Sequence, residues 1–472
     1  MEEYGYAIIG QGAAAFAAAI KADELGLKTV MIGKNETKGA VLGGTCVNVG
    51  CVPSKRLITL GNFMDKINFN RFEGLEYYSK IKNFSRIIEE KDYLVGSMRF
   101  SKYQKVLAKL KNVKYINDFA SFKNKNTLLV NGKEIRAKSI LIAKGARANI
   151  PAIEGLDKVD YVTNEEALSF KKLPKSLVII GAGALGLEFA EMFSHFGVKV
   201  TVLQRSNSIL KDWEPEVSYY LEQYLKDEGI NIITDTAINK VSKSGKNVKI
   251  TFSNKGKTRE IYAEKLLLAT GRKANIEKLG LKSIGVKVNE GGFIKVDGYL
   301  RTSIKNIYAA GDVTGEPMLE ALAAAEGNKA TINASGKGKA KIDFDSVPSA
   351  VFTFPEAARV GLTDKEANTG KKIRCSCGVV MFKDLAKAGI IKDTRGLIKM
   401  VIDADTKRIL GVEIVGENAA DLIHESTLAI KFKLSIDDII DTVHVFPTLS
   451  EITKLAALSF YHNIEDLSCC SE

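Results

Sequence analysis

Two cysteines with glycine, proline and lysine neighbours are the residues of this sequence best suited to redox or metal chemistry. Cys46 and Cys51 lie within the segment 43–55, with Gly50 directly before the second cysteine and Pro53 shortly after it. This pattern favours a loop that runs into the first turn of a helix. The helix dipole and Lys55, one turn later, lower the pKa of a thiol there. We therefore expect Cys51 to ionise more readily than Cys46. The alternative is a pair of buried, unreactive thiols.

Two glycine-rich segments each follow a predicted buried strand and precede a predicted helix. The first strand spans 4–9 and the second spans 176–180. The small loop residues are Gly10, Gly12 and Ala15 in the first segment and Gly181, Gly183 and Gly186 in the second. Such residues let a dinucleotide pyrophosphate approach the backbone N–H groups. One such loop is a weak signal, but two in the same context predict two dinucleotide-binding units.

The strand that follows each glycine-rich unit is expected to end in an acidic residue that binds the adenosine ribose. In the first unit this position holds Gly33, and Glu36 lies nearby but out of register. In the second unit the strand 199–203 is followed by Arg205. An arginine there can pair with a 2′-phosphate, which favours NADPH, with NADH still possible. The alternative is an ordinary surface arginine.

Length, charge and cysteine count narrow the class of protein. A chain of 472 residues predicts about three domains. The net charge of +12 comes from scattered lysines and arginines, so we expect a solvated surface and no nucleic-acid partner. Six cysteines are too few for a disulfide scaffold, which favours the cytoplasm. Since no uninterrupted apolar run approaches ~18 residues, we expect no membrane segment.

The segment 43–55 resembles the redox-disulfide segment of the pyridine nucleotide–disulfide oxidoreductase family, and the resemblance extends over nearly the whole chain. It implies an α/β fold with two Rossmann-like dinucleotide-binding domains, for FAD and NAD(P), and a C-terminal α+β dimerisation domain. The expected FAD domain comprises 1–150 and 274–344, and the expected NAD(P)H domain comprises 151–273. The expected dimerisation domain, 345–472, forms a homodimer in which each subunit completes the active site of the other.

The resemblance also assigns roles to single residues. It implies that Cys46 and Cys51 form a disulfide against the flavin, that Glu188 pairs with Lys55 beside the flavin ring, and that Asp312 binds the ribityl chain. The alternative role for Asp312 is the N-cap of a helix at 319–333, and both roles are compatible. Further expected cofactor-binding residues are Gly44, Thr45, Gly271 and Gly311.

Two features near the C-terminus bear on the electron acceptor. Family members that reduce small disulfides carry a histidine before a proline, and this histidine moves a proton to the departing thiolate. Here Phe446 precedes Pro447, and a phenyl ring carries no proton. His444 is an alternative proton carrier, although the register favours Phe446 as the matching position.

The chain ends with Cys469 and Cys470, whose soft thiolates suit a soft metal ion. The alternative is two idle thiols at a frayed terminus.

Together these features resemble the mercury(II)-reducing branch of the family. That branch commonly has tyrosine where this chain has Phe446, and often an N-terminal metal-binding domain, for which we find no counterpart. The resemblance implies that Cys469 and Cys470 of the partner subunit capture Hg(II) from a thiol complex. Cys46 and Cys51 then receive the ion, which NADPH reduces to Hg(0) through FAD. Alternatives are a thioredoxin-reductase-like or other disulfide reductase that uses the tail cysteines as a relay, and a flavoprotein that only sequesters metal.

The remaining pattern predicts secondary structure and one further cysteine pair. Residues 119–135 predict a hairpin that turns at Asn131–Gly132, followed by a separate strand at 139–143 that ends at Lys144, where the family usually carries threonine. Helices are expected within 58–110, at 419–432 and at 450–460, and antiparallel strands at 396–404 and 409–415.

Cys375 and Cys377 would face the same side of a strand. We interpret them as core thiols, with a shared metal ion as the alternative.

Overall fold

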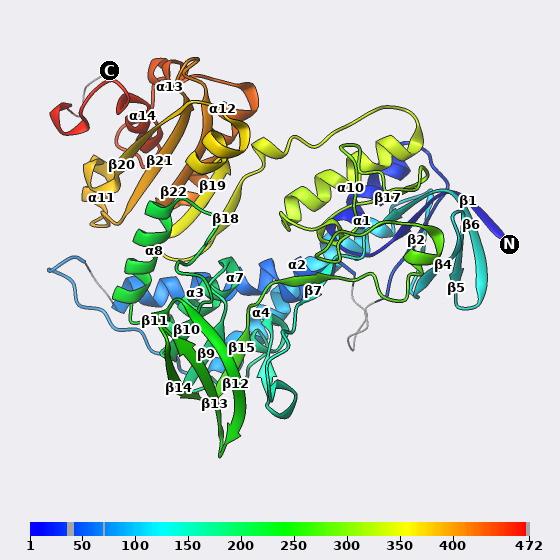
Figure 1. Ribbon diagram of the computed structural model, residues 1–472, viewed down its shortest axis with the longest axis horizontal. Coiled ribbons are helices and arrows are strands. Elements are labelled where there is room, and N and C mark those ends of the chain that lie inside the picture. The colour runs from blue at the N-terminus through cyan, green and yellow to red at the C-terminus, as the bar shows by residue number, and fades with distance from the viewer. Residues whose placement is uncertain (35–41, 69–70, 469–472) are drawn as a thin grey trace. The chain divides into compact units, whose positions relative to one another are not determined.

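The computed structural model describes residues 1–34, 42–68 and 71–468. The chain forms two compact units, which are drawn in Figure 1 and described separately here. The first unit contains residues 1–54, 85–149 and 271–342, and the second contains residues 55–84, 150–270 and 343–472. Each unit contains parallel strands and helices, so the α/β class predicted from the sequence is confirmed.

The first unit is built on a seven-stranded sheet. In spatial order its strands are β3 (Val113–Ile116), β2 (Thr29–Ile32), β1 (Glu2–Ile9), β6 (Lys133–Ile142), β5 (Thr127–Val130) and β4 (Ala120–Asn124), and β17 (Ile307–Ala309) also pairs with β6. The pairs from β3 to β6 and the pair between β17 and β6 are parallel, whereas β4 and β5 form an antiparallel edge. All of β2 is buried, as a parallel strand covered on both faces requires.

The region from 119 to 143 differs from the sequence-based expectation. The turn at Asn131–Gly132 is confirmed, with φ of +47° and +73°. It joins β5 to β6, however, and β6 runs through Ile142 without a break. The expected separate strand at 139–143 is therefore wrong. One ten-residue strand pairs with β5 at its start and with β17 at its end, while β1 pairs with it from residue 135 to residue 142.

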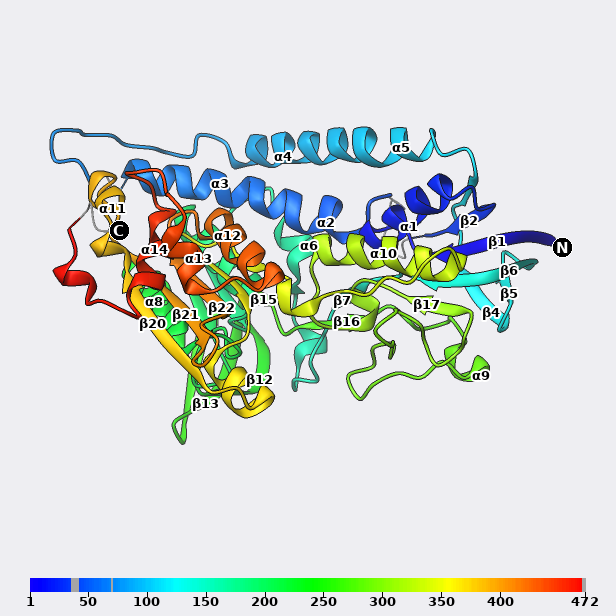
Figure 2. The same cartoon turned by 90° about the horizontal axis from the view of Figure 1, so that it is seen from above.

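Helices α1 (Ala13–Glu24) and α10 (Glu320–Ser335) lie side by side in both views (Figures 1 and 2). Their contact depends on small residues. A Cβ atom at Gly327 would lie 2.0 Å from the carbonyl oxygen of Ala14, so only glycine allows this approach. Ala15 and Ala18 of α1 are fully buried in the same core. A small two-stranded sheet, β7 (Ala146–Ala148) with β16 (Arg272–Ala274), completes the strands of this unit.

The part of the second unit formed by residues 150–270 contains one parallel sheet and one antiparallel sheet. The parallel sheet has the order β11 (Asn231–Ile233), β10 (Lys199–Leu203), β9 (Ser176–Ile180), β15 (Lys265–Leu268) and β8 (Tyr161–Val162). The antiparallel sheet contains β12 (Thr236–Ser244), β13 (Asn247–Asn254) and β14 (Lys257–Ala263). The strands expected at 176–180 and 199–203 are confirmed at their predicted bounds.

A five-stranded antiparallel sheet forms the last part of the chain. Its order is β18 (Ser349–Val351), β19 (Glu356–Gly361), β22 (Ile409–Gly416), β21 (Gly396–Asp403) and β20 (Cys375–Met381). One face of this sheet forms an apolar core with α12 (Ala419–Phe432), α13 (Ile436–Asp441) and α14 (Glu451–Leu458). The expected strands at 396–404 and 409–415 and the expected helices at 419–432 and 450–460 are confirmed, to within a few residues at their ends.

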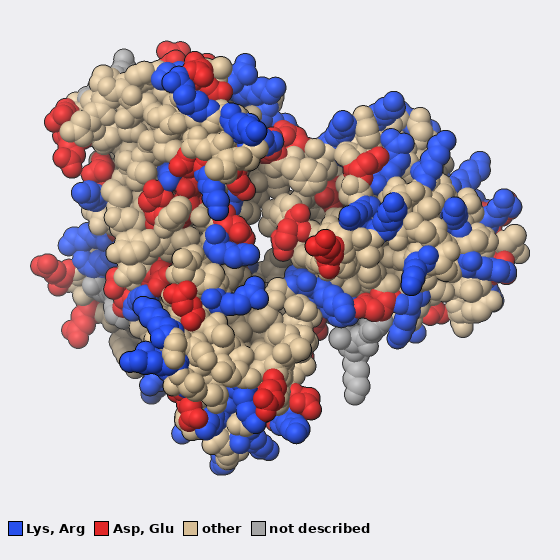
Figure 3. Space-filling model, in the orientation of Figure 1, with Lys and Arg blue, Asp and Glu red and all other residues tan. Residues whose placement is uncertain are grey.

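Most remaining helices flank these sheets. They are α2 (Gly44–Val49), α3 (Cys51–Asn68), α4 (Phe84–Arg99), α5 (Lys105–Leu107), α6 (Asn164–Ala167), α7 (Ala184–His195), α8 (Pro215–Asp227), α9 (Leu281–Ile284) and α11 (Ala386–Ile390). Helices α3 to α5 confirm the helical character expected within 58–110, with a non-helical stretch before Phe84. No helix of the described residues is long and apolar enough to cross a membrane. On the face shown in Figure 3, basic side chains lie among acidic ones.

We predict that Gly327→Ala destabilises the first unit by about 1–3 kcal/mol, because the added methyl group forces α1 and α10 apart. Gly96→Ala is the matched control, since Gly96 also lies inside a helix but a Cβ there meets only the end of the Arg99 side chain at 4.0 Å. That variant should gain up to about 1 kcal/mol. Urea unfolding of both variants measures the difference. Equal effects would contradict the packing argument.

Candidate active site

Cys46 and Cys51 lie on two consecutive helices of the chain. Cys46 belongs to α2, and Cys51 is the first residue of α3. The expectation that Cys51 opens a helix is confirmed, whereas the expected loop before it is wrong. Gly44–Val49 forms a short helix instead, which Gly50 ends with φ of −131° and ψ of −118°. Cys46 is half-buried and Cys51 is exposed, so only Cys51 is freely open to solvent.

Helix α2 is fixed by close backbone contacts and by one asparagine. A Cβ atom at Gly44 would lie 2.7 Å from the Cα atom of Gly12, so the cysteine segment touches the first glycine-rich loop. The Gly43 N–H donates to the carbonyl oxygen of Gln11 over 2.9 Å. The Asn48 amide donates to the Gly44 carbonyl at 2.8 Å and accepts from Arg99 at 3.0 Å. The cysteines therefore lie directly beside the loop predicted to bind a dinucleotide.

The two thiols differ in their tendency to ionise. Both cysteines are free in the structure, which corresponds to the reduced pair. A hydrogen bond with the Cys51 sulfur raises the pKa of the Cys46 thiol, and burial raises it further. Negative charge on Cys51 and on Glu320 acts in the same direction. The pKa of Cys46 is therefore raised by its neighbour, whereas the earlier ionisation of Cys51 stays a prediction of the helix-dipole argument.

Lys55 and Glu188 meet in the second unit, as the family resemblance predicts. The Lys55 Nζ atom lies 2.6 Å from Glu188 Oε2 and 4.6 Å from the centre of the Phe352 ring. The other carboxylate oxygen of Glu188 accepts the Phe352 N–H at 3.1 Å. Glu188 is only 6% exposed, and a buried carboxylate needs such partners. The pair fixes the side chain of Lys55, which lies one helical turn beyond Cys51 in α3.

Both glycine-rich loops have the geometry that a dinucleotide requires. A Cβ atom at Gly10 would lie 2.1 Å from the Ala143 oxygen, and one at Gly181 would lie 2.3 Å from the Ala269 oxygen. The helices that follow begin after Gly12 and Gly183, and neither has a capping side chain in the described structure. Their first N–H groups are thus available to a phosphate. A Cβ at Gly183 would meet only open space, which leaves room for the ligand.

Polar residues beside the first glycine-rich loop also suit a bound dinucleotide. Gln11 is 5% exposed, and its Nε2 atom has no hydrogen-bond partner among the described residues, as expected where a polar ligand belongs. Its other amide atom accepts the Tyr115 hydroxyl at 2.9 Å. Sequence reasoning missed Gln11, although a long amide inside a glycine-rich loop was a readable signal. The Tyr115 hydroxyl also lies 2.9 Å from the carbonyl oxygen of Gly33, at the position where an acid was expected, so these two acceptors share its one proton.

Asp312 is a half-buried carboxyl that lies near the expected FAD site in the first unit. Burial raises its pKa, and Arg272, whose Nε atom lies 3.7 Å away, acts in the opposite direction. The N-cap of α10 is Leu319, whereas Asp312 begins a separate short 3₁₀ turn. The alternative role of Asp312 as the cap of this helix is therefore wrong. Several non-helical residues, among them Gly315 with φ of +109°, lie between the two elements.

The remaining expected cofactor residues lie in the same two units. Ala15 is buried in α1, Thr45 is half-buried in α2, and Gly186 packs against the Gly181 carbonyl in α7. Gly271 has φ of +89°, and the Gly311 N–H donates to Glu326 at 2.6 Å. Lys144 lies over the Phe119 ring at 5.7 Å. Glu36 lies outside the described residues.

The end of β10 holds an amide and an exposed cation. Gln204 occupies the position of the expected acid, and its side-chain oxygen accepts the Ala182 N–H of the second loop at 3.0 Å. Sequence reasoning missed this contact, which closes the loop without a carboxylate. Arg205 is exposed beside it. An exposed guanidinium next to this loop suits a phosphate on the ribose.

The segment before the last helix contains His444 and Phe446. Both ring nitrogens of His444 have partners, namely Glu425 at 2.8 Å and the Thr442 carbonyl oxygen at 2.9 Å. His444 is thus tied to its own domain. Phe446 is 53% exposed and lies in an apolar stretch with Val443 and Val445. The tail cysteines, Cys469 and Cys470, lie outside the described residues.

Sequence comparison matches two family models. Residues 4–327 match the model described as pyridine nucleotide-disulphide oxidoreductase, and residues 347–457 match its dimerisation domain. A mercuric reductase of Staphylococcus aureus is 40% identical over 470 residues, which are 99% of this chain and 84% of the relative. A dihydrolipoamide dehydrogenase of Chaetomium thermophilum is 35% identical over 464 residues, which are 96% of this chain and 90% of the relative.

Comparison with solved structures also finds a flavoprotein oxidoreductase. The HOCl-induced flavoprotein disulfide reductase RclA of Escherichia coli aligns with a TM-score of 0.84 at 28% identity, over 96% of this chain and 99% of that one. Enzymes named for a metal ion and enzymes named for a disulfide thus share this fold. Overall similarity therefore does not identify the electron acceptor, which depends on individual residues.

We predict that Cys51→Ala lowers the pKa of Cys46, because the hydrogen bond and the negative charge that raise it are removed. In the reduced protein, alkylation of Cys46 by iodoacetamide at neutral pH should then accelerate about tenfold for each unit of pKa decrease. Mass spectrometry of the Cys46 peptide across a pH series measures this rate. Cys377, whose pKa burial raises to about 12, is an internal reference that should stay equally slow to react in both proteins. An unchanged or slower rate at Cys46 would contradict the assignment.

Proposed function

Because this chain belongs to the pyridine nucleotide–disulphide oxidoreductase family, we propose that it is an NADPH-dependent mercuric reductase that converts Hg(II) to Hg(0). The observation that carries this proposal is the phenyl ring of Phe446 at the position where disulfide-reducing members hold a proton-carrying histidine. A disulfide acceptor needs a proton for its leaving thiolate, whereas a metal ion does not. The 40% identity to a mercuric reductase over almost the whole chain supports it.

Cys46 and Cys51 are the proposed final ligands of Hg(II). Thiolates prefer soft metal ions, and two of them satisfy the linear coordination of mercury. Cys51 meets the incoming complex first because it is exposed, and Cys46 follows once its proton is released. When bound, FAD and NADPH supply the two electrons that this reduction needs. Neutral mercury binds thiolates poorly and leaves.

The proposed cofactor sites use the residues described above. Gly10, Gly12, Gln11 and Asp312 hold FAD in the first unit. The loop at 181–186 holds NADPH, and Arg205 contacts its 2′-phosphate. Lys55, held by Glu188, positions positive charge beside the dithiol. These assignments divide the chain into the FAD, NAD(P)H and dimerisation domains expected from the sequence.

We further propose that the protein is a homodimer and that Cys469 and Cys470 of the partner subunit deliver Hg(II). The chain carries the family's dimerisation domain, and Val443, Val445 and Phe446 expose apolar side chains on it, at 90%, 74% and 53%. Such a stretch suits burial against a second copy. Two thiols on a terminal arm exchange ligands readily with a thiol-bound metal ion.

A disulfide reductase is the second candidate, favoured by the likeness to RclA and to a dihydrolipoamide dehydrogenase. In that case the tail cysteines pass electrons to an external disulfide. Only the acceptor distinguishes the two candidates, because both use the same dithiol and the same cofactors.

We expect the purified holoenzyme to oxidise NADPH when Hg(II) is added in excess small thiol, with release of Hg(0) vapour in equal amount. Thioredoxin and small disulfides should give no turnover above background. Cys51→Ser should abolish the mercury-dependent rate, and Gly96→Ala should retain it. Turnover of a disulfide without mercury would overturn the proposal in favour of the second candidate.

The delivery role has its own test. With Hg(II) bound to bulky thiols, Cys469→Ala combined with Cys470→Ala should lose most of the activity, because Cys46 and Cys51 cannot reach the shielded ion. With small ligands on Hg(II) the same double variant should keep most of it. Ser468→Ala, which keeps both tail sulfurs, is the matched control. Equal rates for the double variant and the control on the bulky complex would contradict delivery by the tail.

A further inference from the structure

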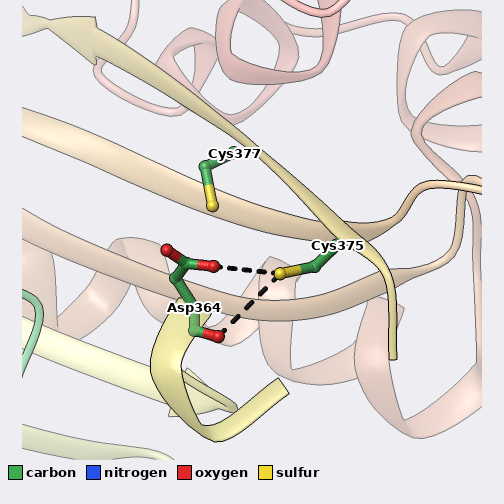
Figure 4. A group of neighbouring side chains, drawn as sticks. All are labelled: Asp364, Cys375 and Cys377. Carbon is green, nitrogen blue, oxygen red and sulfur yellow. Dashed lines mark hydrogen bonds between the residues drawn. The ribbon is translucent and has the colours of Figure 1, made fainter. Parts of the chain in front are cut away.

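A second group of metal-ligating side chains lies in the second unit and plays no part in the proposed reaction. Cys375 and Cys377 project from β20, the edge strand of the antiparallel sheet, and Asp364 projects from a helical turn after β19 (Figure 4). One ligand atom from each residue lies within 4.8 Å of the other two. Figure 4 shows both sulfur atoms on the side of the strand that faces the Asp364 carboxylate.

These cysteines are not core residues, so our interpretation of them as packed thiols is wrong. Along β20 the buried positions are Gly378 and Val380, which lie on the face that meets the apolar core. Side chains alternate along a strand, and Cys375 and Cys377 therefore occupy the other face. Cys375 is half-buried and Cys377 is exposed. Hydrophobic packing does not account for two thiols placed there.

The carboxylate of Asp364 is held in place by its neighbours. Its Oδ1 atom accepts the Asn368 side-chain amide at 2.6 Å and the Cys375 thiol at 3.0 Å. Its backbone N–H donates to Glu214 Oε1 at 2.5 Å, and Glu214 in turn binds the buried Lys399 at 2.9 Å. Metal ligands in proteins are commonly oriented by such outer contacts. The Asp364 side chain is thus positioned beside the sulfur atoms before any ion binds.

The charges of the three side chains suit a divalent cation. Cysteine binds metal ions as the thiolate, so an ion that displaces the two thiol protons is held by two thiolates and one carboxylate. Its charge then offsets the repulsion among these three groups.

We propose that Asp364, Cys375 and Cys377 form a binding site for a thiophilic divalent cation such as Zn²⁺, with water as the fourth ligand. In a tetrahedral zinc site with Zn–S of about 2.3 Å and Zn–O of about 2.1 Å, neighbouring ligand atoms lie ~3.5–3.8 Å apart. The three ligand atoms lie within 4.8 Å of one another, and the Cys375 sulfur lies 3.0 Å from Asp364 Oδ1, so the separations bracket those of such a site. Binding releases two protons per ion.

The test uses the full-length holoenzyme with the tail cysteines replaced by Cys469→Ala and Cys470→Ala and with the Cys46–Cys51 pair oxidised. Zn²⁺ is titrated against a chromogenic chelator, and Co²⁺ is titrated while the thiolate-to-cobalt absorption is recorded. We expect one equivalent of either ion, a thiolate-to-cobalt band, and release of two protons per Zn²⁺ in weakly buffered solution.

Three variants decide whether these residues are the ligands. The double variant Cys375→Ser with Cys377→Ser should no longer bind one equivalent of Zn²⁺ and should lose the thiolate-to-cobalt band. Asp364→Asn should weaken Zn²⁺ binding about tenfold or more. Ser376→Ala is the matched control, because Ser376 lies between the cysteines but on the opposite face of β20. The single variant Cys377→Ser, at an exposed position, replaces the double variant if that one fails to fold. Absence of stoichiometric binding, or binding unchanged in the cysteine variants, would overturn the proposal.

Discussion

The buried carboxylate of Glu188 makes the contacts that hold three segments of the second unit together. It binds Lys55 of α3 through one oxygen and the backbone of Phe352, next to β18, through the other. One turn later in α7, the buried Glu191 accepts the Phe354 N–H at 2.7 Å. Since a buried charge deprived of its partner costs about 3–5 kcal/mol, these contacts fix three segments far apart in sequence. The helix that begins at Cys51 is thereby anchored to the helix that follows the second glycine-rich loop.

Close backbone contact is the corresponding constraint in the first unit. Gly10 touches the end of β6, Gly44 touches Gly12, and Gly327 touches α1, each at a distance that no side chain permits. The first glycine-rich loop, helix α2 and helix α10 are thus packed at distances that only glycine permits. Because a tightly packed interior tolerates no extra atoms, these contacts fix the positions of the three segments.

Local patterns in the sequence predicted the strands, the glycine-rich loops and the start of α3, because these follow from hydrophobic period and backbone freedom within a few residues. Contacts between distant segments were less accessible. The pairing of Lys55 with Glu188 came only from the family resemblance, and the contact of Gln204 with the second glycine-rich loop was missed. Asp312 was offered as the cap of α10 as one alternative, although Gly315 and Pro317 mark a break between them. The partner of Cys375 is an aspartate before a turn, which strand alternation alone does not reveal.

The same residue type serves two different purposes in the functions proposed for this chain, and the neighbours decide which. Cys46 lies beside a second sulfur, whose hydrogen bond raises the pKa of the Cys46 thiol, and the two cysteines are the proposed redox pair. Cys375 lies beside a carboxylate that accepts a hydrogen bond from its thiol, which suits a site for a cation that takes up no electrons. A dithiol beside a flavin can reduce either a disulfide or a metal ion. What separates these reactions is the fate of the proton on the leaving group. Phe446 has no proton to move, so in the proposed function the acceptor is decided by a residue far along the chain from Cys46 and Cys51.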